Sequence, residues 1–213
     1  MRKPVSRELS PLPQDYPKLW LLAHLSLTRF LIDHLKEGND ARDTGWWLRL
    51  WNWCWCLAEC GLALTWCLLE AVPESWPAGI RVLFGVVAVW RINEVAYAFY
   101  SDGISRLRGI PPRSDIQGFE RVGMLLRSAC GLVVQFAVLY FLLDATSFKQ
   151  HFVDFRDALY FSAATTTSIG QEGQEVQGYI ARFLHIYQSA LGILLFALAL
   201  SIYAGGVESR EAT

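Results

Sequence analysis

The sequence of 213 residues lacks the motifs of the common enzyme classes. It contains no H-E-x-x-H, no G-x-S-x-G and no phosphate-binding P-loop, and its four histidines are dispersed along the chain. The five cysteines fit no zinc-binding spacing, and they lie in apolar stretches instead of the loops that a disulfide framework needs. We therefore predict a protein that is not an enzyme, with no catalytic residue, no metal site and no cofactor, in which the cysteines are small apolar side chains packed between helices.

The N-terminus also lacks the pattern of a secretory signal peptide, because no apolar core and small-residue cleavage site follow its basic start. What the chain has instead is four apolar blocks, at residues 46–71, 79–100, 122–143 and 180–203, with the charges concentrated between them. Each block is long enough to cross the roughly 30 Å hydrocarbon core of a bilayer as an α-helix. The sequence thus predicts an all-α membrane protein with four transmembrane helices per chain.

Residues 17–36 predict a further helix near the N-terminus. Pro17 suits the first turn of a helix, Gly38 suits its end, and the charged residues between them fall on one side. This amphipathic helix carries too many charges to span a membrane. It is expected either to lie at the membrane interface or to pack as an ordinary helix against the others.

A short helix is predicted between the third and fourth blocks, over residues 155–166. At about 18 Å it is too short to cross the bilayer, so a segment that enters here must return on the same side. A run of hydroxyls and glycines follows it. Irregular backbone at membrane depth is tolerated only inside protein or beside a water-filled cavity, so a re-entrant half-helix followed by a polar loop is the pattern of a pore.

Residues 158–173 read Ala-Leu-Tyr-Phe-Ser-Ala-Ala-Thr-Thr-Thr-Ser-Ile-Gly-Gln-Glu-Gly. This stretch resembles the pore module of tetrameric potassium channels and their prokaryotic relatives, which reads approximately A-L-Y-F-S-x-x-T-L-T-T-V-G-Y-G-D. The resemblance extends over residues 122–203. Within the quoted stretch the residue-by-residue match holds through Gly170 and then fails, because Gln171 and Glu172 stand where the family has a tyrosine and a second glycine. It implies a homotetramer whose outer pore helix, half-helix and inner helix surround a path for monovalent cations.

The resemblance also implies which residues line that path. A potassium filter directs backbone carbonyls at the ion. The corresponding filter residues here are Thr167, Ser168, Ile169, Gly170, Gln171 and Glu172. A side chain at Glu172 disfavours the backbone angles that glycine allows, so we expect a remodelled filter with a carboxylate ring and weak preference for potassium over sodium. The alternative is that Gln171 and Glu172 close the axis.

The inner helix is expected to stop at Gly205-Gly206. On this helix, the resemblance implies that Gly192 is a flexing point. Leu195 and Phe196, together with Leu200, would form an apolar constriction that gates the pore. The alternative for these side chains is lipid contact or packing between helices.

Three charged residues lie away from the ends of the first two spans, toward mid-membrane. A short turn joins these spans, so they are antiparallel, and counting outward from the turn places Glu59 and Arg91 at nearly the same depth. Glu94 lies one helical turn from Arg91. Because a charge at mid-membrane requires a partner, we predict a buried Glu59–Arg91–Glu94 cluster, either structural or part of a gating switch.

Basic residues concentrate in the first 49 residues and in the loop 101–121. By the positive-inside rule this places both termini in the cytoplasm of a multi-pass protein of the cell's inner membrane. The loop carries Arg106, Arg108, Arg113 and Arg121. These arginines either only set the topology or bind an anionic regulator such as a nucleotide, an oligonucleotide or a lipid headgroup.

The predicted organisation is an N-terminal segment (1–45), a two-span hairpin with its basic loop (46–121), a pore module (122–206) and a short tail (207–213). The predicted function is a weakly selective cation channel gated by a cytoplasmic anion or partner protein. Its plan is similar to that of bacterial membrane effectors of anti-phage defence, some of which respond to nucleotide or oligonucleotide messengers. The alternative is a non-conducting membrane scaffold or sensor with a pore-like fold.

Overall fold

The computed structural model describes residues 41–68, 76–107, 116, 118–143, 145–150, 152–169 and 174–211. The predicted amphipathic helix 17–36 lies outside these ranges, as do several predicted site residues. These are Arg108, Arg113, Gly170, Gln171 and Glu172, together with the side chain of Arg106.

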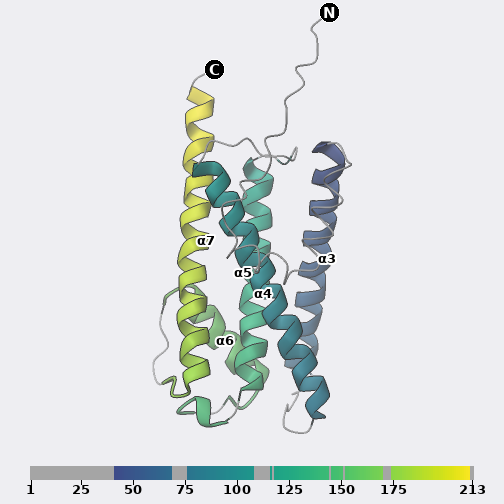
Figure 1. The fold of residues 1–213 in the computed structure, drawn as a ribbon, viewed down its shortest axis with the longest axis vertical. Coiled ribbons are helices and arrows are strands. Elements are labelled where there is room, and N and C mark those ends of the chain that lie inside the picture. The colour runs from purple at the N-terminus through teal and green to yellow at the C-terminus, as the bar shows by residue number, and fades with distance from the viewer. Residues whose placement is uncertain are drawn as a thin grey trace, which may run out of the picture.

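The described residues form α-helices joined by short connections, with one 3-10 turn, η2 (Ala145–Ser147). The helices are α3 (Ala41–Leu68), α4 (Ala78–Leu107), α5 (Gly118–Leu142), α6 (Phe155–Thr166) and α7 (Tyr179–Glu211). Four long helices run along the length of the bundle, and the short α6 occupies one end of it beside α5 and α7 (Figure 1). The predicted all-helical class is confirmed for the described part of the chain.

Three helices are long and apolar enough to cross a membrane: Ala78–Tyr100 within α4, Phe119–Leu142 within α5 and Tyr179–Leu200 within α7. Helix α3 is also long, at about 42 Å, but it carries Asn52, Glu59 and several tryptophans and is not among these candidate spans. Three of the four predicted spans thus have the required length and composition, and the first span stays a prediction.

The ends of the helices differ from the prediction. Helices α4 and α5 extend into the region predicted as the loop 101–121, and α7 continues through Gly205-Gly206, where we expected it to stop. A glycine in a helix costs only about 1 kcal/mol relative to alanine, so two glycines weaken a helix without ending it. The predicted stop at Gly205-Gly206 is therefore wrong.

Helix α5 is the centre of the bundle and contacts each of the other four described α-helices. Its buried rings Phe136 and Tyr140 pack against each other, and Tyr140 packs with Phe161 of α6. At the same end of the bundle, Trp66 of α3 contacts Phe155, the first residue of α6, at 5.0 Å between ring centroids. Burial of each such ring contributes about 1.5–3 kcal/mol, so α6 is anchored from both sides.

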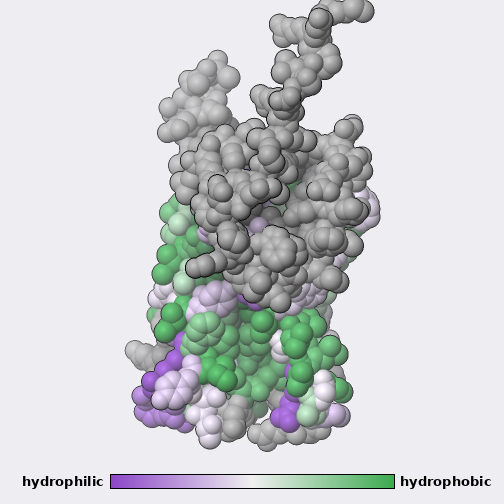
Figure 2. All heavy atoms as spheres, in the orientation of Figure 1, coloured by the Kyte–Doolittle hydropathy of each residue, from purple (hydrophilic) through white to green (hydrophobic). Residues whose placement is uncertain are grey.

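The outer faces of the long helices are apolar. Val82 and Val86 of α4 and Phe183 and Phe196 of α7 are each at least 60% exposed. Among the coloured residues of Figure 2, apolar side chains cover much of the surface, and hydrophilic side chains gather at the lower end. Exposed apolar area of this extent indicates contact with lipid or with other chains instead of water.

The five cysteines are all unpaired. Cys56 and Cys67 are half-buried, whereas Cys54, Cys60 and Cys130 are exposed. The prediction that all five pack between helices is wrong for the exposed three, because their positions fall on the outward faces of α3 and α5.

Candidate functional site: the half-helix and its supports

Helix α6 begins at a side-chain cap. The Asp154 carboxylate accepts a hydrogen bond from the Asp157 N–H at 3.1 Å and another from Arg156 Nε at 2.8 Å. Partial burial tends to raise the pKa of Asp154, but the bonds from Arg156 and from the backbone N–H outweigh it and hold this pKa below its usual value. The cap satisfies a donor that the helix itself leaves free, and so fixes where α6 starts.

Helix α6 ends in a Schellman motif. The Ser168 N–H donates to the Thr165 carbonyl and the Ile169 N–H donates to the Ala164 carbonyl, each at 3.2 Å. Ser168 has a φ of 56°, in the left-handed region that this motif requires and that glycine usually supplies. The chain therefore leaves the helix abruptly, immediately before the glycine- and glutamate-containing stretch 170–173.

The segments on either side of the half-helix and its loop are joined to each other. Phe148 and Val176 form an antiparallel bridge, and the Lys149 N–H donates to the Glu175 carbonyl at 2.9 Å. The chain thus enters α6 and leaves the loop at one end of the bundle, where α7 begins (Figure 1). The predicted bounds of the half-helix are confirmed, whereas its position in a membrane stays a prediction.

Gln188 of α7 holds the half-helix in place. Its side chain is 1% exposed. Its Nε2 lies 2.8 Å from the Ser162 carbonyl oxygen and 2.7 Å from both the Ser162 and the Thr166 hydroxyl oxygens, and its Oε1 accepts from the Tyr140 hydroxyl at 2.8 Å. Because Ser162 also donates to the Val133 carbonyl at 2.7 Å, this polar cluster joins α5, α6 and α7.

Gly192 of α7 lies against the end of α6. A Cβ at this position would be 2.6 Å from the Thr166 carbonyl oxygen, closer than real Cβ contacts come. The structure therefore shows a close approach between the two helices here, and the predicted role of Gly192 as a flexing point stays a prediction. Of the predicted constriction, Leu195 is buried within the chain, while Phe196 and Leu200 are exposed.

The residues after α6 are uncovered in the single chain. Thr167, Ser168 and Ile169 are exposed, and Ile169 is 80% exposed. They lie at the C-terminal end of α6, where the helix dipole places partial negative charge. This end can therefore attract a cation.

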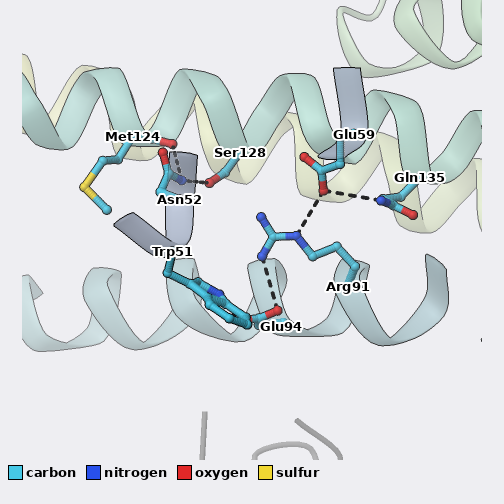
Figure 3. Close-up of polar contacts among 8 residues, drawn as sticks. All are labelled: Trp51, Asn52, Glu59, Arg91, Glu94, Met124, Ser128 and Gln135. Carbon is cyan, nitrogen blue, oxygen red and sulfur yellow. Dashed lines mark hydrogen bonds and ion pairs between the residues drawn. The ribbon is translucent and has the colours of Figure 1, made fainter. Parts of the chain in front are cut away.

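The Glu59–Arg91–Glu94 cluster lies on the other side of α5 (Figure 3). Arg91 Nε lies 3.0 Å from Glu59 Oε1, and Arg91 Nη1 lies 3.2 Å from Glu94 Oε2. All three residues are buried. The structure thus brings together the residues that depth counting had paired.

Further groups complete this cluster. Gln135 donates to Glu59, Trp51 donates to Glu94, and the Trp55 ring lies 4.6 Å from the Arg91 guanidinium. Gly131 leaves room for the Glu59 carboxylate, which a Cβ there would overlap. Sequence reasoning missed these supports and missed Gln188. Gln135 and Gln188 each gave only the signal of a lone amide inside an apolar run.

Of the four loop arginines, only the side chain of Arg121 is described. Its Nε donates to the Ile116 carbonyl at 3.0 Å and its Nη1 lies 3.2 Å from Asp102 Oδ1. Arg121 therefore ties the start of α5 to the end of α4.

Comparison with known proteins locates a family signal in this region. No curated protein and no solved structure matches the chain. The family model described as ion channel matches residues 128–207, which include α6 and most of α5 and α7. The half-helix, its loop and its two supporting helices are thus the part of the chain that is similar to the ion channel family.

Proposed function

We propose that this chain is a subunit of a membrane ion channel in which α5, α6 and α7 form the pore module. The observation that carries the proposal is the half-helix: α6 is short, is held by Gln188 and Gly192, and is followed by a loop that returns to the end where α6 began. The match of residues 128–207 to the ion channel family supports it.

We further propose that the assembly is a homotetramer. One α6 per chain cannot enclose an axis, and the exposed end of α6 together with the exposed face of α7 is available to neighbouring subunits. Four spans per chain, counting α3, and cytoplasmic termini agree with the distribution of lysine and arginine.

The permeant ions in this proposal are monovalent cations. The C-terminal end of α6 and a ring of Glu172 carboxylates would both favour positive charge along the axis. Since Gln171 and Glu172 replace the tyrosine and glycine of potassium filters, selectivity among cations is expected to be weak.

Regulation is assigned to a cytoplasmic anion. Because Arg121 already contacts Asp102, the anion would meet Arg106, Arg108 or Arg113. A nucleotide or oligonucleotide ligand would suit a role in anti-phage defence, because the architecture is similar to that of the membrane effectors of such systems.

A non-conducting scaffold is the competing function, and the turn at Ser168 favours it. That turn engages the carbonyls of Ala164 and Thr165 in hydrogen bonds within the chain, so each has one lone pair fewer for an ion. In the channel proposal, the ion is coordinated instead by the carbonyls after Thr165 and by the hydroxyls at the exposed end of α6.

Flux measurements separate the two functions. The full chain is reconstituted in lipid vesicles, and sodium, potassium and chloride fluxes are measured with and without cytoplasmic extract. The channel proposal expects cation flux above that of protein-free vesicles and little chloride flux. Equal fluxes with and without protein, in both conditions, would establish the scaffold.

A further inference from the structure

Arg127 of α5 differs from the other well-described arginines at its end of the bundle. Arg49 is paired with Glu120 at 2.9 Å, and Arg121 contacts Asp102. Among the residues that the structure describes, no carboxylate lies within ion-pair distance of Arg127. This residue nevertheless sits within the apolar span Phe119–Leu142, where a charge without a partner is unfavourable.

The guanidinium of Arg127 is held in one orientation by neutral groups. Its Nε donates to Asn52 Oδ1 at 2.6 Å, and the ring of Trp53 lies 4.5 Å from its central carbon. Asn52 is itself fixed, because it is buried and its Nδ2 donates to the Ser128 hydroxyl at 3.1 Å. These contacts orient the charge without neutralising it.

The remaining edge of the guanidinium is unoccupied by the residues that the structure describes. The two terminal nitrogens make no hydrogen bond to any described residue, and at Gly123, one turn earlier on α5, a Cβ would meet only Arg127 Nη1, at 3.7 Å. A paired set of N–H donors beside such a gap matches the oxygens of a phosphate group, which arginine binds with two parallel hydrogen bonds.

The surroundings of Arg127 are those of a lipid-facing surface near a membrane interface. Trp53 is 51% exposed and Leu126 is 57% exposed. Helices α3 and α5 begin at the same end of the bundle (Figure 1), where Trp46 and Trp47 are also exposed, as in an interfacial aromatic belt. Arg127 lies about 13 Å along α5 from its start, and helical side chains tilt toward the N-terminus, so the guanidinium reaches back toward headgroup level.

We infer that Arg127 binds the phosphate group of an anionic phospholipid, in a site on the outer surface of α3 and α5 formed with Gly123, Asn52 and Trp53. This site lies outside the pore module's half-helix. It depends on the chain's being embedded in a membrane and not on whether the chain conducts ions.

Thermal unfolding of the full chain in detergent tests the site. Phosphatidylglycerol, phosphatidylcholine or inorganic phosphate is added, and the midpoint is followed against concentration. The parent protein is expected to be stabilised by phosphatidylglycerol more than by phosphatidylcholine, and little by inorganic phosphate. Arg127→Gln should raise the half-saturating phosphatidylglycerol concentration by about tenfold, since it removes charge-assisted hydrogen bonds.

Two further variants keep the test decisive. Arg81→Gln removes the same charge from the opposite end of the bundle and should respond like the parent. Gly123→Leu keeps Arg127 and introduces a good helix former, so the protein should fold. The leucine side chain fills the gap beside Arg127, so the phosphatidylglycerol response should be lost. This second variant tests the site even if Arg127→Gln does not fold.

Several results would overturn the inference. They are an equal response of the parent to both lipids, an equal response to inorganic phosphate, and equal losses in Arg127→Gln and Arg81→Gln. Retention of the phosphatidylglycerol response in Gly123→Leu would do the same. Dissociation of the native oligomer in Arg127→Gln, measured by mass, would show instead that the partner of Arg127 is a carboxylate of a neighbouring subunit.

Discussion

The guanidinium of Arg91 links two helices directly, through Glu59 of α3 and Glu94 of its own helix α4, and Gln135 extends the contact to α5. Such a buried ionic group adds little net stability over a well-packed apolar alternative, because desolvation offsets the attraction. Removing only one charged partner of the group is strongly destabilising, because an unpaired charge is then left in an apolar region.

A double-mutant cycle measures this pairing. Arg91→Met should lower the free energy of unfolding in detergent by about 3–5 kcal/mol, because Glu59 and Glu94 lose their shared partner. Adding Glu59→Gln to Arg91→Met should restore part of that loss. If the effects of the two substitutions simply add, Glu59 and Arg91 are not energetically coupled.

Gln188 gives a second prediction at this scale. Gln188→Leu leaves the buried Tyr140 hydroxyl without its acceptor and frees Ser162 and Thr166, so unfolding should become easier by about 2 kcal/mol. Ser189→Ala is the matched control, because the Ser189 hydroxyl donates only to the His185 carbonyl of its own helix. Calorimetric midpoints that fall equally in both variants would show that the cluster does not hold α6.

The sequence could identify a pair of contacting residues only where the connection between their helices fixes the relative position of the two residues. Glu59 and Arg91 could be paired because a short turn joins their helices and fixes their relative depth. Gln188 and Arg127 could not, because their partners come from helices separated by long stretches of chain and an isolated polar residue carries no periodic signal. The filter residues 170–172 stay predictions.

At the scale of elements, the existence of α6 followed from its apolar pattern, and its bounds matched the prediction. The ends of α4, α5 and α7 did not match the prediction. A helix continues wherever its own hydrogen bonds outweigh a weak local signal such as Gly205-Gly206. The packing of α6 on α7 depends on the close approach at Gly192, which a sequence-based expectation of flexibility did not reveal.

Gly192→Ala tests that approach. The added methyl group would overlap the Thr166 carbonyl, so we expect α6 to shift and unfolding to become easier by about 1–3 kcal/mol. At Gly85 of α4 a Cβ would meet nothing within 4 Å, so Gly85→Ala should be neutral or stabilise by up to about 1 kcal/mol. A Gly192→Ala protein as stable as the parent would contradict the close contact.

The cap of α6 has a pH dependence of known direction. The pKa of Asp154 is lowered in the folded chain, so its contribution is present above the unfolded value of about 3.9 and is lost as pH falls through the folded value. Asp154→Ala should cost about 1 kcal/mol at neutral pH. Asp154→Asn keeps a capping side chain but should abolish this part of the acid dependence of unfolding, which denaturant titrations at several pH values would reveal.

At the scale of the whole molecule, the prediction concerns the proposed axis. Mass measurement in detergent should give a tetramer, and Glu172→Gln should lower the preference for cations over anions in reversal-potential recordings, because it neutralises one carboxylate per subunit. Glu175→Gln is the control, since Glu175 lies 3.5 Å from Lys149 at the base of the loop. A monomer, or equal ion preference in parent and Glu172→Gln, would contradict this arrangement.

The contact between Trp66 and Phe155 also has a spectroscopic consequence. Trp66 is 5% exposed, and the ring of Trp76 lies 5.0 Å away at an interplanar angle of 75°. Two indoles this close and inclined in this way couple their electronic transitions, and the adjoining Phe155 ring belongs to the first turn of α6. The circular dichroism of the tryptophans in the near ultraviolet therefore reports, without any added label, whether the half-helix is seated in the bundle.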